Sequence, residues 1–327
     1  MRIAFVAPDP SEFISGGNIY NRNLIEALVA RGCSVELMST LPAADEKYDC
    51  TILDSIYFNL IEKAPAPPNT FALVHHLGSL YPMSADRFET EDRPLLDKCD
   101  NYVVTSPFMQ EFLTRKGYAL DSITMVEPVA PPLAKSNRAP VTKVKAVMLN
   151  NLVERKGVLD FLTQLAKAEV PPYYTLRIIG SPDAEPEYSA ACHELVRSNA
   201  NLSKTVSFLG SQDDAGVKSV MQKSNLFISA SKMETFGMSI QEASLQGLPL
   251  LVCEGGYSGR HVIPGENGWR VNGTEEAVKV FARLTAQPGE LSVMAERAFV
   301  TESIYATSCD KSAESLVRFL ARKIQSN

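Results

Sequence analysis

The sequence of residues 229–249 is SASKMETFGMSIQEASLQGLP, a pattern that predicts a strand end, a polar loop and a helix in succession. The strand is expected to end near Ser229, and the helix to begin near Gly237 and end at Gly247, with Pro249 beyond. The start of such a helix carries unpaired backbone N–H groups and the positive end of the helix dipole. Gly237 would let the backbone approach a ligand closely. The stretch therefore predicts an anion site, suited to a diphosphate, at the end of a buried strand.

The same alternation of strand-like runs and helical patterns continues along the rest of the 327-residue chain. It predicts an α/β fold, in which parallel strands are joined by crossover helices. Ligands of such sheets bind outside the carboxyl ends of the strands, so functional residues are expected just after them. Strands are expected at residues 3–7, 34–38, 48–53, 70–74, 102–105 and 123–126, and then at 143–149, 176–179, 206–209, 226–229 and 250–253.

A change in composition divides the chain at residues 127–140, where periodicity is lost and prolines crowd together. This composition is typical of a stiff linker. A chain of 327 residues is also long for one hydrophobic core and suits two cores of about 150 residues each. We therefore predict two doubly wound, Rossmann-like domains that face a central cleft, at residues 1–135 and 141–300. A helical segment is expected to follow at residues 301–327.

The net charge of −6 is concentrated in residues 1–135, which hold 11 lysines and arginines against 18 aspartates and glutamates. No basic stripe could neutralise a nucleic-acid backbone, so nucleic acid is not expected as a partner. The acidic first part also argues against docking on anionic lipid. No apolar run approaches the ~18–20 residues of a membrane-spanning helix. Residues 1–8 are too short an apolar segment for a secretory signal, so a cytoplasmic location is expected.

The six cysteines are scattered and contain no C-x-x-C pair, which favours reduced structural thiols over a disulfide framework or a zinc site. The chain also lacks a D-x-D motif that would indicate a bound metal at a diphosphate site. We therefore expect neither a metal nor a resident cofactor.

Two carboxylates flank the predicted helix start and are suited to different tasks. Glu234 lies in the loop ahead of the helix and could reach past the phosphates toward a sugar. Glu242 lies about one turn inside the helix, where a carboxylate can accept hydrogen bonds from both hydroxyls of a ribose. By spacing alone, two glutamates eight residues apart are more often solvated surface charges, and only the strand–loop–helix context favours the binding role.

The pattern Glu234-x7-Glu242, followed by Gly247 and Pro249, resembles the donor-site signature of retaining GT-B glycosyltransferases of family 4. The resemblance extends over most of the chain and includes a glycine loop and a His-bearing strand end in the first half. It also includes a basic phosphate clamp and a last donor loop in the second half. The corresponding motifs are Ser15-Gly16-Gly17, Val74-His75-His76, Val104-Thr105-Ser106, Glu154-Arg155-Lys156-Gly157, Gly255-Gly256 and Asn267-Gly268.

The resemblance implies roles for individual residues. Glu234 would bind hydroxyls of the donor sugar and Glu242 the ribose, while Lys156, helped by Arg155, would neutralise the leaving diphosphate. His75, rather than its neighbour His76, is expected near the reacting sugar, although a packed histidine is the alternative. His75, Glu234 and Lys156 are thus the expected catalytic residues. The expected donor-binding residues are Gly16, Gly17, Arg155, Lys156, Glu234, Phe236, Gly237, Met238 and Glu242.

Two positions depart from the family pattern. Many members have an arginine five residues before the clamp lysine, where this chain has Asn151, and a glutamate after the glycine pair, where it has Gly259. Arg155 is a candidate to replace the missing arginine. These departures leave the geometry of the clamp open.

The sequence thus predicts a retaining glycosyltransferase that moves a sugar from a nucleoside diphosphate sugar, UDP- or GDP-linked, to a hydroxyl acceptor. The acceptor, a sugar, a glycolipid or a small molecule, would bind mainly to the first domain and the donor to the second. The final helical segment would cross back to the first domain, as in the family it resembles. The alternatives are a nucleotide-sugar epimerase or hydrolase of the same fold, and an inactive protein that binds nucleotide sugars.

Overall fold

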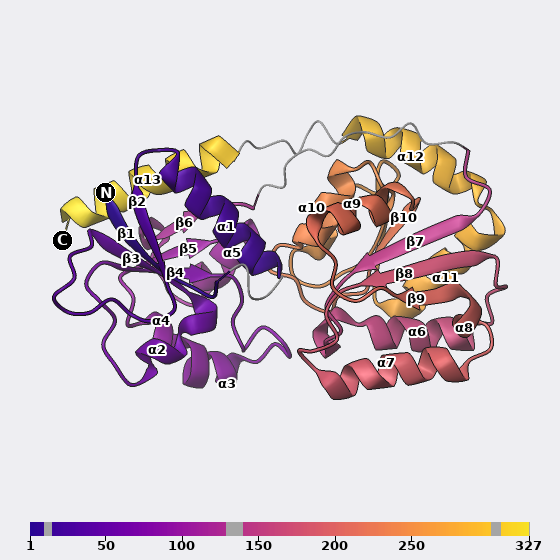
Figure 1. The fold of residues 1–327 in the computed structure, drawn as a ribbon, viewed down its shortest axis with the longest axis horizontal. Coiled ribbons are helices and arrows are strands. Elements are labelled where there is room, and N and C mark those ends of the chain that lie inside the picture. Colours follow the sequence, from indigo (N-terminus) through magenta and orange to yellow (C-terminus); the bar gives the residue numbers. More distant parts are fainter. Residues whose placement is uncertain (10–14, 129–139, 302–308, 327) are drawn as a thin grey trace. The chain divides into compact units, whose positions relative to one another are not determined.

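The computed structural model describes residues 1–9, 15–128, 140–301 and 309–326 (Figure 1). The chain divides into two compact units, Met1–Val129 with Thr307–Asn327, and Ala130–Ala306. Each unit carries one six-stranded sheet in which all pairings are parallel, so the predicted two-domain α/β fold is confirmed. Most of the predicted linker at 127–140, and residues 302–308 and 327 of the predicted last segment, fall outside the described residues.

The first unit has the strand order β2-β1-β3-β4-β5-β6. Its central strands have sequences such as CTILD and TFALV, in which every residue is buried, because helices cover both faces of the sheet. The strands are β1 (Arg2–Val6), β2 (Ser34–Met38), β3 (Cys50–Asp54), β4 (Thr70–Val74), β5 (Asn101–Val104) and β6 (Ile123–Met125). The helices are α1 (Gly16–Val29), η1 (Ser55–Tyr57), α2 (Asn59–Glu62), α3 (Ala85–Arg87), η2 (Phe88–Asp92), α4 (Arg93–Leu96), α5 (Pro107–Arg115), η3 (Leu120–Ser122) and α13 (Cys309–Ser326).

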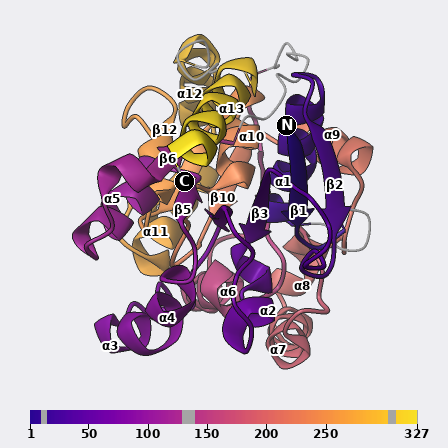
Figure 2. The ribbon, with the colours of Figure 1, turned by 90° about the vertical axis from the view of Figure 1, so that its left-hand side faces the viewer.

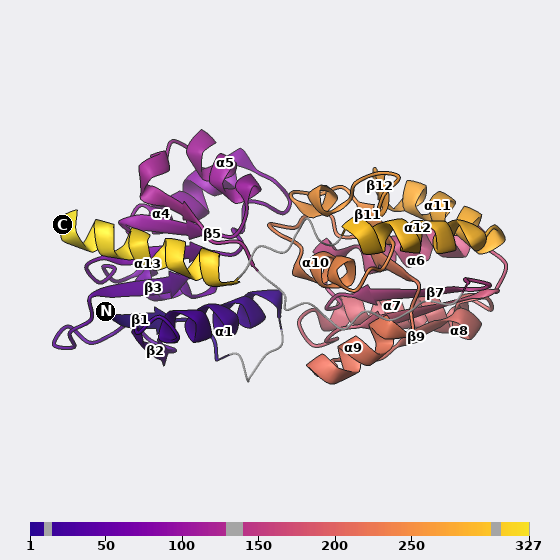
Figure 3. The same cartoon turned by 90° about the horizontal axis from the view of Figure 1, so that it is seen from above.

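The last helix of the chain, α13, is part of this first unit. It packs against α1 and β6, and Figure 3 shows it running beside α1. The ring of Phe319 on α13 lies edge-on to Phe71 of β4, with centroids 5.9 Å apart. Figure 2 shows α1 and α13 on one side of the sheet and α2 and α4 on the other. The C-terminal segment therefore completes the covering of the first sheet.

The second unit has the strand order β12-β11-β10-β7-β8-β9. Alternate residues of β7 serve its two faces: Val144 and Met148 join the core formed with α6 and α11, whereas Val147 joins the core formed with α9 and α10. The strands are β7 (Val144–Leu149), β8 (Tyr174–Ile179), β9 (Val206–Phe208), β10 (Leu226–Ser229), β11 (Leu250–Cys253) and β12 (Gly268–Val271). The helices are η4 (Glu154–Lys156), α6 (Val158–Lys167), α7 (Pro186–Ser198), α8 (Leu202–Thr205), α9 (Asp214–Gln222), α10 (Met238–Leu245), η5 (Ser258–His261), α11 (Thr274–Ala286) and α12 (Gly289–Thr301).

Each sheet has a point at which the order of its strands reverses. In the second unit, β7 pairs with β8 on one side and with β10 on the other. In the first unit, β1 lies between β2 and β3. Loops that leave neighbouring strands in opposite directions open a crevice at the carboxyl ends, which is where ligands of open parallel sheets bind. Among the described helices, none is both long enough and apolar enough to cross a membrane.

Candidate functional site

Three loops meet at the carboxyl edge of the second sheet, after β7, β10 and β11. Backbone hydrogen bonds hold them together. The N–H of Lys232 donates to the carbonyl of Arg155 at 2.8 Å, and the N–H of Glu234 donates to that of Gly255 at 3.1 Å. The carbonyl of Glu234 in turn accepts from the N–H of Tyr257 at 2.7 Å. The loop that carries Glu234 is thus fixed from both sides.

The close approach of these loops requires glycine at the positions where they touch. A Cβ on Gly157 would lie 2.2 Å from the carbonyl oxygen of Ala230, and one on Gly256 would lie 2.2 Å from that of Glu234. Both glycines also have a positive φ, of 65° and 63° respectively. A side chain at either position would push the backbone of the β10 loop away.

Lys156 and Glu234 form a buried ion pair where the β7 and β10 loops meet. The Nζ of Lys156 lies 2.5 Å from Oε1 of Glu234, and their side chains are only 16% and 9% exposed. Burial by itself raises the pKa of Glu234, but the charges of Lys156 and Arg155 outweigh it and lower that pKa overall. Burial lowers the pKa of Lys156, and Glu234 opposes this effect. Glu234 is therefore held as a carboxylate.

The helix α10 begins directly beside this pair with an open N-terminus. Its cap residue, Gly237, has a φ of 95° and offers no side-chain hydrogen bond. The carbonyl of Gly237 accepts from the N–H groups of Ile240 and Gln241. In the part of the chain that the structure describes, the N–H groups of Met238 and Ser239 have no acceptor. This arrangement has the features of an anion site, with free donors and the positive end of a helix dipole.

A buried histidine fixes the peptide just before Gly237. The Nε2 of His261 lies 2.7 Å from the carbonyl oxygen of Phe236, and His261 is only 7% exposed. Its ring lies edge-on to those of Phe236 and Tyr257. Burial lowers the pKa of His261, so the neutral imidazole donates this bond. The sequence alone did not indicate this contact.

Glu242 lies on α10 in an environment unlike that of Glu234. It is partly buried, and its carboxyl group has neither an ion-pair partner nor a hydrogen-bond partner among the described residues. Burial, with a smaller contribution from the negative charge of Asp214, raises its pKa from 4.5 to about 7. The two glutamates of the motif therefore ionise over different pH ranges.

Asn151, which replaces the arginine of the family pattern, ties two loops together. Its Oδ1 accepts from the N–H of Ser181 at 2.9 Å. The guanidinium of Arg155 lies near enough to Glu234 to lower its pKa, and it has no carboxylate partner in the described ranges. Arg155 thus stays a candidate for the missing cation.

His75 follows β4 at the carboxyl edge of the first sheet and lies in a hydrogen-bonded chain. Its Nε2 lies 2.8 Å from Oδ1 of Asn21 on α1, and Nδ2 of Asn21 donates to Oδ2 of Asp54 at 2.6 Å. Burial lowers the pKa of His75, and the charge of Asp54 opposes this effect. Asn21 and Asp54 were not identified from the sequence, because an Asn on a helix and an Asp at a strand end carry no local signal of each other.

The glycine loop lies against this histidine. Ser15 caps α1, its Oγ accepting from the N–H of Asn18, so Gly16 and Gly17 form the first turn of the helix. A Cβ placed on Gly17 would lie 3.7 Å from the ring of His75. The structure thus brings the two predicted motifs of the first unit together.

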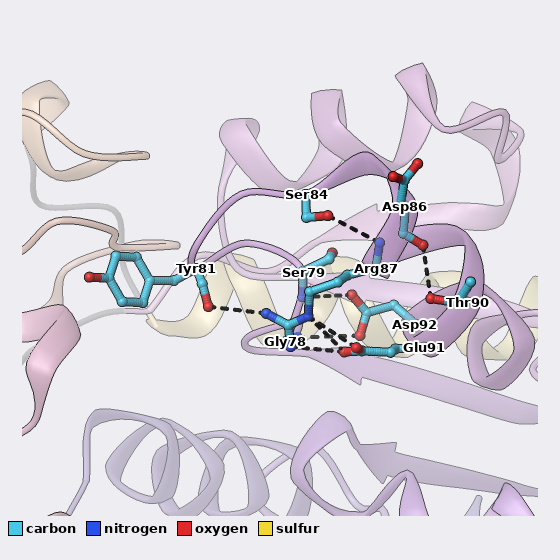
Figure 4. Close-up of polar contacts among 9 residues, drawn as sticks. All are labelled: Gly78, Ser79, Tyr81, Ser84, Asp86, Arg87, Thr90, Glu91 and Asp92. Atoms are coloured by element: carbon cyan, nitrogen blue, oxygen red, sulfur yellow. Dashed lines mark hydrogen bonds and ion pairs between the residues drawn. The ribbon is translucent and has the colours of Figure 1, made fainter.

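A preorganised loop follows His76 and leads to η2 (Figure 4). Asp92, which is buried, accepts from the N–H groups of Gly78 and Ser79, at 3.3 and 3.0 Å. Arg87 forms an ion pair with Glu91 at 2.8 Å, and its guanidinium also donates to the carbonyl of Tyr81. Figure 4 shows the ring of Tyr81 pointing away from this cluster.

The predicted site residues thus fall into two groups, one in each unit. One group, in the second unit, contains Arg155, Lys156, Glu234, Phe236, Gly237, Met238 and Glu242. The other, in the first unit, contains Gly16, Gly17 and His75. Across the described ranges, no group of three or more His, Cys, Asp or Glu residues is placed to hold a metal ion.

Residues 131–300 match the model of a protein family described as glycosyl transferases group 1. Among curated proteins, the chain is 30% identical over 113 residues to alpha-monoglucosyldiacylglycerol synthase from Acholeplasma laidlawii. That match covers 33% of this chain and only 28% of the relative's length.

Solved structures share the fold over the whole chain. Sucrose-phosphate synthase (tll1590) from Thermosynechococcus elongatus has a TM-score of 0.78 at 17% identity, with all of both chains covered. Anabaena Alr3699/HepE in complex with UDP and glucose has a TM-score of 0.77 at 16% identity, covering 98% of this chain and 100% of that one. At these identities the likeness shows the fold, GT-B, and nothing finer.

The close approach of the loops can be tested by comparing two glycines with the same backbone conformation. Gly157 and Gly210 both have a φ of 65°, but a Cβ on Gly210 would meet no described atom within 4 Å. Gly210→Ala should cost about 1 kcal/mol from backbone strain alone. Gly157→Ala should cost about 3 kcal/mol or more, because its Cβ would strike the Ala230 carbonyl. Urea denaturation measures both, and equal costs would show that the loops do not touch as described.

The raised pKa of Glu242 predicts a pH dependence of stability. A group whose pKa is higher in the folded state than in the unfolded state stabilises the protein at low pH. For Glu242 this contribution is lost as pH rises from 4.5 to about 7, the pKa in the folded state. Glu242→Gln should therefore gain stability relative to the unmodified protein between about pH 5 and pH 8, by up to about 3 kcal/mol.

Glu234→Gln removes the other carboxylate of the motif for comparison. It leaves the buried Lys156 without its partner, so it should lose stability throughout this pH range. The loss should be no larger at about pH 8 than at about pH 5, because the lowered pKa of Lys156 favours its neutral form as pH rises. Thermal unfolding across this range measures both variants. A Glu242→Gln variant whose relative stability does not change with pH would show that the carboxyl is not buried as described.

Proposed function

The chain belongs to the glycosyl transferases group 1, and from that membership we propose that it moves a sugar from a nucleoside diphosphate sugar to a hydroxyl acceptor. The observation that carries the proposal is the Lys156–Glu234 ion pair beside the open N-terminus of α10. A cation, free N–H donors and a carboxylate are the groups that a diphosphate and a sugar require.

The diphosphate would lie at the start of α10. The free N–H groups of Met238 and Ser239 support this assignment, together with the positive φ of Gly237, which keeps a side chain away from the ligand. Cleavage of the bond between sugar and phosphate places negative charge on the leaving diphosphate. Lys156, Arg155 and the helix N-terminus would stabilise that charge more in the transition state than in the ground state. With these fixed positive groups, the reaction would need no metal ion and no resident cofactor.

Glu234 would bind hydroxyls of the donor sugar as a carboxylate, since its pKa is lowered. Glu242 would accept hydrogen bonds from the ribose, and binding would then favour its ionised form. His75 would contact the reacting sugar. Because Lys156 already engages the Glu234 carboxylate, we propose retention by front-face attack assisted by the leaving phosphate.

The first donor to test is UDP-glucose. Anabaena Alr3699/HepE, which shares the fold, was solved in complexes with UDP and glucose and with UDP-glucose. For the acceptor, the first unit supplies a preorganised loop at residues 78–92, from which the ring of Tyr81 projects (Figure 4). A sugar, a glycolipid or a small molecule with a free hydroxyl remains the proposed acceptor class, and the cytoplasm the proposed location.

Nucleotide binding tests the donor site directly. Thermal unfolding is measured with UDP, GDP and ADP, on the unmodified protein and on Glu242→Ala. A ligand at ~100 times its dissociation constant stabilises the folded state by about 2.7 kcal/mol, which gives a measurable rise in Tm. One nucleotide should raise the Tm of the unmodified protein and not that of the variant. If none of the three does so, the donor-site assignment is wrong.

Sugar transfer tests the role of the ion pair. Lys156→Ala should lower kcat about 10²- to 10³-fold, the usual effect of removing a group that stabilises transition-state charge. Lys145→Ala is the matched control, since Lys145 lies on β7 in the same unit but is exposed, and it should leave kcat unchanged. Product analysis by NMR gives the anomeric configuration. Sugar released or epimerised without any acceptor would instead favour a hydrolase or an epimerase, and binding without turnover an inactive protein.

A further inference from the structure

A chain of hydrogen bonds links Asp54 to Asn21 and Asn21 to His75, and it joins three elements of the first unit. Asp54 ends β3, Asn21 lies on α1, and His75 follows β4, the neighbour of β3 in the sheet. Asn21 is fully buried and Asp54 is 2% exposed, while the side chain of His75 is 16% exposed. Buried polar side chains that are linked in this way hold one another in a single arrangement of donors and acceptors.

The direction of each hydrogen bond follows from the carboxylate. Both oxygens of Asp54 accept: Oδ1 from the N–H of Ile56 at 3.0 Å, and Oδ2 from the amide of Asn21 at 2.6 Å. A carboxylate can only accept, so Asn21 must turn its NH₂ toward Asp54 and its carbonyl oxygen toward His75. That oxygen can only accept in turn, so the Nε2 of His75, 2.8 Å away, must carry the hydrogen.

A neutral imidazole carries one hydrogen, so the Nδ1 of His75 is left with a free lone pair. Within the described residues, Nδ1 has no hydrogen-bond partner. Asp54, with Oδ2 3.7 Å from Nε2, is the charged group that faces the ring. The ring also lies beside the edge-on ring of Tyr20, with centroids 4.9 Å apart, and beside Gly17. Burial lowers the pKa of His75, so the ring stays neutral near pH 7.

We propose that Asp54 and Asn21 are positioning residues, which hold His75 as the Nε2–H tautomer so that Nδ1 accepts a hydrogen bond from a hydroxyl of the sugar substrate. The contact with substrate rests on the proposed function, whereas the tautomer rests on the hydrogen-bond chain alone. In the opposite tautomer, Nδ1 would carry a hydrogen and could no longer accept. The correct form therefore depends on a carboxylate that never needs to touch the substrate.

The tautomer is measured by ¹⁵N NMR of the histidine rings. The chain has four histidines, so His→Gln variants can assign every signal. His75 should show a protonated Nε2 and an unprotonated Nδ1 near pH 7. The opposite pattern in the unmodified protein would overturn the proposal, and this measurement does not need an active enzyme.

Replacing Asp54 by asparagine should reverse the direction of the hydrogen bonds that link Asp54, Asn21 and His75. In Asp54→Asn, the new side chain must present its oxygen to the N–H of Ile56 and its NH₂ to Asn21. Asn21 then turns over and offers its own NH₂ to Nε2, so His75 should convert to the Nδ1–H tautomer. Transfer should fall about tenfold or more in kcat, the cost of one hydrogen bond lost in the transition state.

The double swap Asn21→Asp with Asp54→Asn should restore the original direction. The carboxylate at position 21 accepts both from the amide at position 54 and from Nε2 of His75. The Nε2–H tautomer and most of the lost rate should therefore return. Tyr20→Phe is the matched control, because it removes a buried hydrogen bond to Val126 beside the same ring without touching Nε2. It should leave the tautomer of His75 unchanged.

The outcomes separate the two proposals. If Asp54→Asn leaves both the tautomer and the rate unchanged, the positioning role is wrong. If the tautomer reverses and the double swap restores it, but no nucleotide sugar is turned over, the hydrogen-bond chain stands and the proposed function fails. If the tautomer reverses while the rate stays the same, His75 does not accept a hydrogen bond from the substrate.

Discussion

The ion pair between Lys156 and Glu234 is the interaction on which the rest of the second unit's site depends. Two charges that are largely removed from water are costly unless each is matched at short range, and here Nζ and Oε1 lie 2.5 Å apart. That distance holds only if the β7 and β10 loops cannot separate. The hydrogen bond from Lys232 to Arg155, and glycine at 157, keep them together. The same loop then delivers Gly237 and the open start of α10 beside the charges.

Two glutamates eight residues apart illustrate how environment assigns chemistry. Glu234 lies next to two cations, which lower its pKa. Glu242 is partly buried without a cation beside it, and its pKa rises to about 7. A pair of carboxylates whose environments push their pKa values apart can take different roles at one pH. Glu234 is available as a permanent charge, whereas Glu242 gains its charge most readily when a ligand supplies hydrogen-bond donors.

The sequence predicted whatever depends on local pattern. Residues 229–249 specify a strand end, a loop and a helix, and the observed elements end at Ser229 and begin at Met238. Contacts between segments that are distant in the sequence could not be predicted, because they depend on strand order and register. Asp54 and His75 become neighbours only when β3 pairs with β4. Asn151 could be identified as a departure from the family pattern. Its hydrogen bond with Ser181 could not be predicted, because Ser181 lies in the loop after β8, distant in the sequence.

Each unit has a largely buried, neutral histidine at the carboxyl edge of its sheet, and the position of the single ring hydrogen must be fixed in both. A protonated imidazole donates from either nitrogen, but a neutral one must carry its hydrogen on the correct side. In the second unit a backbone carbonyl, that of Phe236, fixes the choice, and a carbonyl cannot be turned over by substitution. In the first unit the side-chain amide of Asn21 fixes which nitrogen of His75 carries the hydrogen, and a side-chain amide can adopt either of two orientations. Asn21 therefore needs a further group to orient it, and this is why a carboxylate one step removed from the histidine is part of the site.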